Sequence, residues 1–267
     1  MSEVQQQSYS AVKAPFSRCF ALLQAAERNF QLAKFGVQQL SAMDAAELPT
    51  SLYPRVYSVY PGLQADSQMP PNYTREQLKL EVDKEMAEGF PLLSASAATA
   101  FWTVLEDLAR EFLTYWVIAH PAKATLRKPG RILSISRGSL LNLEANRDNL
   151  AWEICLDIMK EVEAKSAVYR YDACQAMLGL TLPKAENPLL SILTELEAVR
   201  HIIVHRNSVV DEQFKRRCPS PKDVPEEIGD VLHVNSTRLE RYRNAVYGYV
   251  DIMMQRVRQA VPEVVNF

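Results

Sequence analysis

LLSILTELEAVRHIIVHRN, residues 189–207, is the stretch from which the fold can be worked out. Its apolar side chains recur at intervals of three and four residues, the spacing that places them on one face of an α-helix. The members of this apolar arc are Leu189, Ile192, Leu193, Leu196, Val199 and Ile203. Pro188 comes just before them, and proline is favoured in the first turn of a helix. We therefore predict a helix from Pro188 to about Arg206.

Helical periodicity extends over most of the chain on both sides of this stretch. The predicted helices cover residues 16–43, 74–88, 92–119, 146–178 with a break near Ser166, and 236–262. Thr74 and Ser236 stand where N-cap residues are expected. Alternating strand patterns are hinted at only in residues 131–136 and 231–234. The sequence therefore predicts an all-α (mainly α) fold, a helical bundle of four long helices after residue 90 with an N-terminal helical extension.

The chain changes character between residues 49 and 73, where prolines alternate with tyrosines. A long helix cannot form there, because proline lacks the amide hydrogen and clashes with the preceding turn. We interpret this segment as an extended connector whose tyrosines pack along a neighbouring surface, and a Pro/Tyr ligand for a partner domain is the alternative. The predicted domains are residues 1–72, an N-terminal helix with this connector, and residues 73–267, a helical domain.

The composition excludes several classes of protein. The formal net charge is −2, so no overall positive field draws the molecule to nucleic acid, and the 8 glycines form no phosphate-binding loop. The 4 cysteines are scattered without a C-x-x-C pair, which favours a reducing compartment and a cytoplasmic location. No segment has the apolar character of a signal peptide or a membrane span, so we expect a soluble protein without a membrane partner.

Positive charge is concentrated between Phe112 and Leu143, a stretch without any acidic residue. Its bases are Lys123, Arg127, Lys128, Arg131 and Arg137. Because phosphate groups bind to clusters of lysine and arginine, these residues are the candidates for binding RNA. A solvated loop between two helices is the alternative interpretation. A second, shorter basic cluster, Lys215–Arg217, follows the helix that begins at Pro188.

Arg200, His201 and His205 are the candidate chemical groups on the central helix. On an ideal helix, at about 100° per residue, Arg200 falls within the apolar arc, where a guanidinium needs an acceptor. Glu106, in the apolar helix 92–119, is the predicted partner, and a purely structural ion pair is the alternative. Arg200 and His205 differ by about 140°, so one ideal helix directs them apart. They would converge in a symmetric dimer, or if the helix unwinds near His205.

His201 and His205 also have the i, i+4 spacing of zinc ligands on a helix. However, Ile202 stands where the HExxH motif carries its glutamate, and no third ligand is identifiable. No local signature of a serine or cysteine hydrolase is present either. We therefore expect neither a metal ion nor any other cofactor.

The segment Arg200–His205 fits the R-x4-6-H motif and resembles that of the HEPN superfamily of helical domains. The surroundings are similar as well, with a preceding helix that carries two glutamates, a following His-Arg-Asn and an exit through Val-Val-Asp. Residues 92–113 resemble the first long helix of these domains, and residues 236–261 resemble the closing helix. The resemblance therefore covers about residues 90–262, and the six-residue motif is its only diagnostic part.

This resemblance implies an activity. Active members of the superfamily are metal-independent endoribonucleases that dimerise so that two motifs face each other, and many are toxins of toxin–antitoxin or phage-defence systems. Carried over to this chain, Arg200 and His205 are the catalytic pair. His201 is the supporting polar residue, beside the predicted partner Glu106.

The leading hypothesis is a cytoplasmic, homodimeric endoribonuclease that cleaves RNA through the 2′-hydroxyl at a composite dimer site. The expected partners are an RNA substrate, a second copy of the chain and, as a further option, an antitoxin or regulatory protein; no DNA partner is expected. A non-catalytic HEPN-like module that binds RNA or a protein partner is the alternative. A structural helical protein in which the motif is accidental is the third interpretation.

Overall fold

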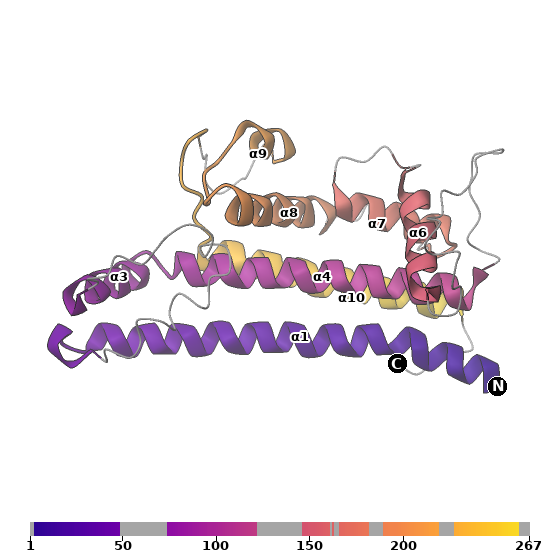
Figure 1. Cartoon of the computed structure of the whole chain (residues 1–267), viewed down its shortest axis with the longest axis horizontal. Coiled ribbons are helices and arrows are strands. Elements are labelled where there is room, and N and C mark those ends of the chain that lie inside the picture. The colour runs from indigo at the N-terminus through magenta and orange to yellow at the C-terminus, as the bar shows by residue number, and fades with distance from the viewer. Residues whose placement is uncertain are drawn as a thin grey trace. The chain divides into compact units, whose positions relative to one another are not determined.

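The computed structural model of this chain describes residues 3–48, 74–121, 146–160, 162, 166–181, 189–218 and 227–261, with side chains from residue 13 onward in the first segment. The fold is all-α, as predicted (Figure 1). Its elements are α1 (Glu3–Ala42), η1 (Ala45–Glu47), α3 (Arg75–Ala87), α4 (Pro91–Ala119), α6 (Arg147–Lys160), α7 (Ala167–Met177), α8 (Leu189–His205), α9 (Glu212–Arg217) and α10 (Ser236–Ala260). Over these ranges the strand-like pairing is a single antiparallel bridge between Val209 and Val231.

Local sequence signals determine where two of the helices begin. The Thr74 hydroxyl accepts a hydrogen bond from the Gln77 amide, and the Gln77 side chain accepts one from the Thr74 amide, so a capping box begins α3. Ser166 begins α7 with a hydroxyl that accepts a hydrogen bond from the Tyr169 amide. The break predicted within residues 146–178 is therefore confirmed.

The start of α10 differs from the prediction by one residue. Asn235 is the N-cap instead of Ser236, because its side-chain oxygen accepts a hydrogen bond from the amide of Arg238 at 2.8 Å. Ser236 is the first residue within the helix. Asparagine and serine are about equally good N-caps, so two adjacent candidates cannot be ranked from sequence alone.

The first helix is longer than predicted, and other predicted features lie outside the described residues. Helix α1 begins at Glu3, because helix-forming residues extend it beyond the apolar periodicity that starts at Phe16. The Pro/Tyr-rich connector at residues 49–73 and the strand-like residues 131–136 are not described. Among the described helices, none is both long and apolar enough to cross a membrane. The cytoplasmic location remains a prediction.

The chain forms two compact units, each built from separate stretches of sequence. The first unit combines residues 1–22, 103–194 and 245–267, and the second combines residues 23–102 and 195–244. Helices α1, α4, α8 and α10 each contribute residues to both units. The units therefore cut across the predicted division at residue 72, and each is considered by itself below.

The core of the first unit is built around Trp116, whose side chain is fully buried. Its indole nitrogen donates a hydrogen bond to the carbonyl oxygen of Leu178 at 3.3 Å, so burial leaves this donor satisfied. Phe112 packs against Trp116 with ring centroids 6.1 Å apart, and Phe16 packs against Phe112 at 5.3 Å. These contacts join residues of α1, α4 and the end of α7 in one apolar core.

In the second unit a buried polar network joins α8 to α10. The Glu195 carboxylate accepts hydrogen bonds from Nε of Arg238 at 2.9 Å, from Nη2 of Arg241 at 2.6 Å and from the Tyr242 hydroxyl at 2.7 Å. Burial raises the pKa of Tyr242, so this hydroxyl stays protonated and remains a donor. The network fixes the segment of α8 that leads to His205.

Candidate functional site

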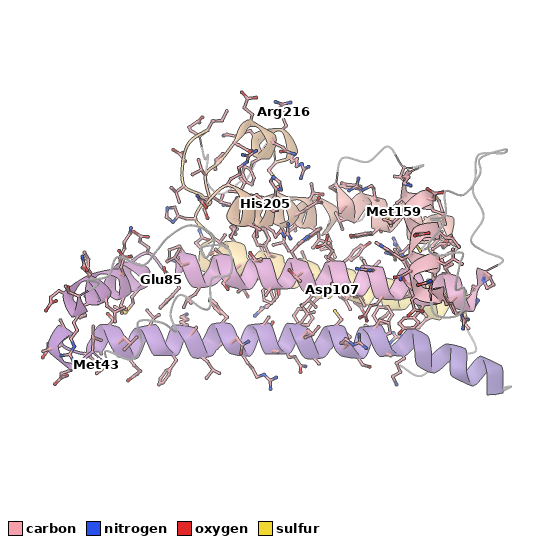
Figure 2. The ribbon with its side chains drawn as sticks, viewed as in Figure 1. Met43, Glu85, Asp107, Met159, His205 and Arg216 are labelled. Carbon is pink, nitrogen blue, oxygen red and sulfur yellow. The ribbon has the colours of Figure 1, made fainter. Side chains whose placement is uncertain are left out.

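The predicted catalytic residues lie on the last turns of α8, at the end of the helix where Figure 2 labels His205. Val199 and Ile202 are fully buried and anchor this end of the helix in the core of the second unit. Arg200 and His201 are half-buried, whereas His205 is exposed. The helix therefore presents these three polar groups, hereafter the Arg–His cluster (Arg200, His201 and His205), at the edge of the core.

The guanidinium of Arg200 and the imidazole of His205 meet within one chain, since Nη1 of Arg200 lies 3.4 Å from Nε2 of His205. An ideal helix would direct them apart, but they converge within one chain at the point where α8 ends. Helix α8 ends at His205, so no further helical turn follows this residue. The long side chain of Arg200 can therefore reach it across the helix surface. Arginine only donates hydrogen bonds, so Arg200 is the donor in this contact whenever Nε2 of His205 carries no proton.

Arg200 is half-buried and is not enclosed in the apolar arc; Ile202, which the predicted arc omitted, is fully buried. The Nε atom of Arg200 is buried and has no hydrogen-bond partner among the described residues. A buried donor without an acceptor costs about 1–3 kcal/mol, so this atom is a local cost to the stability of the fold. Glu106 is half-buried on α4 and belongs to the other unit, so the Arg200–Glu106 pair remains a prediction.

The two imidazoles of the cluster lie side by side, with ring centroids 5.0 Å apart. Partial burial lowers the pKa of His201, and its electrostatic interactions with His205 and Arg217 lower it further. Asp211 has a smaller effect in the opposite direction. His201 is therefore mostly neutral at pH 7, and its ring can accept a hydrogen bond.

Helix α9, which the sequence analysis missed, adds positive charge next to the cluster. Its N-cap is Asp211, whose carboxylate accepts a hydrogen bond from the Phe214 amide at 2.8 Å and lies 3.5 Å from Nε of Arg206. The helix carries the basic residues Lys215–Arg217 in its last turn. Acidic residues at the start and basic residues at the end are signals of a helix. The helix was not predicted because six residues are too few to show apolar periodicity.

Backbone strain marks the turn that follows His205. Asn207 and Ser208 have φ angles of +50° and +62°, in the left-handed region that side chains with a β-carbon disfavour. The Ser208 amide donates a hydrogen bond to the Ile202 carbonyl at 3.2 Å, and the Ser208 carbonyl accepts one from the Leu232 amide at 2.7 Å. The surrounding fold thus holds this turn in place, and strain of this kind clusters at functional sites.

The remaining predicted site residues are not placed. Lys123, Arg127, Lys128, Arg131 and Arg137 lie outside the described residues, so their role in RNA binding stays a prediction. Within the part of the chain that the structure describes, no group of three or more His, Cys, Asp or Glu side chains is arranged to hold a metal ion. His201 and His205 thus have no third metal ligand among these residues.

Comparisons with protein-family models, with curated proteins and with solved structures give no match to this chain. The resemblance to HEPN domains therefore depends on the residues of the motif and their surroundings. The assignment of a function depends on the chemistry that the Arg–His cluster can perform.

Proposed function

We propose that this chain is a metal-independent endoribonuclease of the HEPN type and that the Arg–His cluster is its active site. The observation that carries the proposal is the 3.4 Å separation between Nη1 of Arg200 and Nε2 of His205 at an exposed helix end. Phosphodiester cleavage needs a group that transfers protons near neutral pH and a group that stabilises phosphoryl charge. Histidine and arginine supply these two functions.

The reaction that fits these groups is attack of a ribose 2′-oxygen on the adjacent phosphorus. The bond from O2′ to phosphorus forms, the bond from phosphorus to O5′ breaks, and the products carry a 2′,3′-cyclic phosphate and a 5′-hydroxyl. His205 takes the proton from the 2′-hydroxyl and then returns it to the leaving O5′. Arg200 donates hydrogen bonds to the phosphoryl oxygens as negative charge develops on them.

His201 has a supporting role in this proposal. Its ring lies 5.0 Å from that of His205, close enough to limit how the second ring turns. Lys215, which follows the cluster in the chain, provides positive charge that attracts the RNA backbone. Binding is therefore expected to weaken as the salt concentration rises.

The proposed site is complete within one chain, because the arginine and the histidine that meet belong to the same helix. This differs from the composite arrangement that the resemblance implies. A homodimer, which remains part of the proposal, would bring two such sites together without building either from halves.

The test is cleavage of a single-stranded RNA in excess EDTA by the wild type and by the His205→Ala and His233→Ala variants. We expect the wild type and His233→Ala to release fragments with a 2′,3′-cyclic phosphate, and His205→Ala to be slower by about 10²–10⁴-fold. His233 is exposed and lies in the same unit outside the cluster, so its replacement is a matched control. Equal cleavage by all three proteins would remove the assignment.

The same experiment separates the nuclease from a non-catalytic module. RNA binding without cleavage by every protein, the wild type included, would support a module that only binds. Induced expression in cells gives an independent readout, because growth arrest that His205→Ala relieves is expected only of the nuclease.

A further inference from the structure

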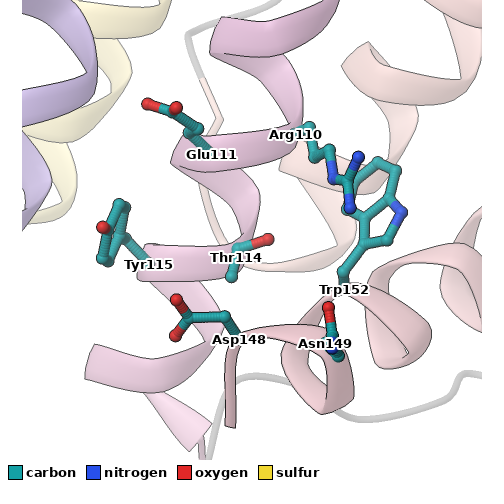
Figure 3. Close-up of a pocket in the computed structure, with 7 residues that line it drawn as sticks. All are labelled: Arg110, Glu111, Thr114, Tyr115, Asp148, Asn149 and Trp152. Atoms are coloured by element: carbon teal, nitrogen blue, oxygen red, sulfur yellow. The ribbon is translucent and has the colours of Figure 1, made fainter. Parts of the chain in front are cut away.

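A pocket of about 220 Å³ lies between α4 and α6 in the first unit and shares no residue with the Arg–His cluster. Its lining includes Arg110, Thr114 and Tyr115 from α4 and Asp148 and Trp152 from α6 (Figure 3). We propose that this pocket binds a guanine base, presented by a mononucleotide or by single-stranded RNA. Binding does not depend on the proposed nuclease activity, since it involves no turnover.

Planar side chains give the pocket surfaces on which a base can stack. The guanidinium carbon of Arg110 lies 5.7 Å from the ring centroid of Trp152, whose indole is half-buried. In Figure 3, Tyr115 lies on the opposite side of the pocket from this pair. Unpaired bases stack on aromatic rings and on arginine guanidinium planes, and the volume suits one flat ring system better than a folded peptide.

Asp148 provides the hydrogen-bond acceptors that distinguish one base from another. The neighbouring carboxylate of Glu111 is engaged by Nη1 of Arg18 at 2.5 Å, which leaves Asp148 as the acidic acceptor for a ligand. Guanine presents two adjacent donors, N1–H and the N2 amino group, and one carboxylate can accept both. Adenine, cytosine and uracil each have a hydrogen-bond acceptor next to a donor on the corresponding edge. A carboxylate can accept from the donor, but it is repelled by the adjacent acceptor.

The charges in the pocket disfavour simpler ligands. Asp148 and Glu111 repel an isolated phosphate, and Arg110 repels a small cation. A neutral base avoids both effects, and a phosphate attached to it can remain near Arg110. Thr114, which is buried, and Asn149, which is exposed, add a hydroxyl and an amide for the remaining polar atoms of the base.

Tryptophan fluorescence can locate the bound nucleotide. Of the 3 tryptophans in the chain, Trp102 and Trp116 are 2% and 0% exposed, so acrylamide reaches Trp152 first. We expect GMP to protect the indole of Trp152 from acrylamide, and we expect the protection to disappear in Trp152→Phe. Titration calorimetry on the same samples gives the affinities, which should favour GMP over AMP, CMP and UMP by about ten- to hundredfold.

The discriminating variant is Asp148→Asn, with Asp107→Asn as its matched control. Both aspartates are exposed, but Asp107 lies on α4 outside the pocket. Asp148→Asn should lower the affinity for GMP at least tenfold and remove the preference over AMP, whereas Asp107→Asn should change neither. Thermal melts check that both variants remain folded, because a carboxylate in the first turn of a helix also stabilises it slightly.

A second ligand distinguishes the source of the base. It is tested with the His205→Ala protein, in which RNA cleavage is greatly slowed under the proposed function. An oligoguanylate that binds no tighter per site than GMP would identify a mononucleotide site, and one that binds much more tightly would identify an RNA site. Equal binding of all four nucleotides, absence of Trp152 protection, or an unchanged GMP affinity in Asp148→Asn would each overturn the proposal. None of these results bears on cleavage at the Arg–His cluster.

Discussion

At the scale of single residues, the shape of the Arg200 side chain matters as much as its charge. The planar guanidinium can donate two parallel hydrogen bonds to phosphate oxygens, whereas the ammonium of lysine acts as a point charge. We therefore expect Arg200→Lys to lower kcat for RNA cleavage about 10²–10³-fold, with a smaller change in KM. Steady-state kinetics on one defined oligonucleotide measures both constants.

Arg206→Lys is the control for this prediction. Arg206 lies 3.5 Å from Asp211 and outside the pair that meets at His205, so the substitution should leave kcat nearly unchanged. An Arg200→Lys enzyme with the kcat of the wild type would contradict a role of the guanidinium in stabilising the phosphoryl group.

His201 is expected to make stability depend on pH. Burial holds its folded pKa below the ordinary value of about 6.5, so the unfolded chain takes up this proton first as the pH falls. The unfolded state then binds more protons, and the free energy of unfolding decreases below about pH 6.5. In His201→Gln this part of the decrease should be absent. Urea unfolding between about pH 7.5 and pH 5 measures the difference, with the exposed His233→Gln as control.

The sequence identified the residues of the Arg–His cluster but not their geometry. Spacing along the chain is enough to select Arg200 and His205, because the motif is short and continuous. Their convergence depends on side-chain torsions and on where α8 stops, and an ideal helix predicts neither. The half-buried position of Arg200 likewise follows from what packs around α8, which local periodicity does not reveal.

At the scale of elements, Glu195 is the residue on which the attachment of α8 to α10 depends. Its carboxylate is the shared counter-charge of Arg238 and Arg241 and is only 8% exposed. Glu195→Gln removes this charge and keeps the volume, so we expect a loss of about 3–5 kcal/mol in the free energy of unfolding. Equilibrium urea unfolding measures the loss.

A matched substitution in an exposed ion pair shows whether burial is the cause of the large stability loss expected for Glu195→Gln. Glu212 lies 2.9 Å from Arg216, and both side chains are more than 70% exposed. Glu212→Gln should therefore cost about 0–1 kcal/mol. Similar losses in the two variants would show that the Glu195 network is solvated and does not hold α8 in place.

The turn between α8 and α9 should be sensitive to the size of the side chain at Ser208. Its φ of +62° is unfavourable for any residue with a β-carbon and worst for a branched one. Ser208→Val is expected to lower stability by about 1–2 kcal/mol, whereas Ser208→Gly should be neutral or stabilising. Thermal and urea unfolding of both variants test this, and equal stability of the two would show that the turn adopts another conformation in solution.

Helix boundaries were predictable where one side chain alone determines them. Thr74 begins a helix as expected, and Ser166 caps the helix that follows the predicted break. Asn235 was missed because Ser236 beside it is an equally good candidate. Helix α9 was missed because its stability comes from the Asp211 cap and from burial of Phe214, and neither produces a periodic pattern in six residues.

At the scale of the whole molecule, periodicity establishes the all-α class but not the division into units. Apolar spacing is a local property, and nearly every long helix can be read from it. Each unit is built from separate stretches of the chain, and α1, α4, α8 and α10 each contribute residues to both. A boundary drawn where prolines accumulate therefore could not coincide with the units.

Two copies of the chain would share the proposed activity without exchanging catalytic residues. If each site takes Arg200 and His205 from the same chain, a mixture of Arg200→Ala and His205→Ala proteins contains no complete site in any pairing of subunits. If instead each site takes one residue from each chain, one of the two sites in a mixed dimer is intact, and activity returns on mixing. We expect no return, because the contact at 3.4 Å lies within one chain. The measurement is RNA cleavage after the two variants, each with a different affinity tag, are unfolded together and refolded. Purification on both tags in turn confirms mixed dimers, and refolded wild type is the reference. Recovery of about a quarter of wild-type activity in the unfractionated mixture would show that the site is composite.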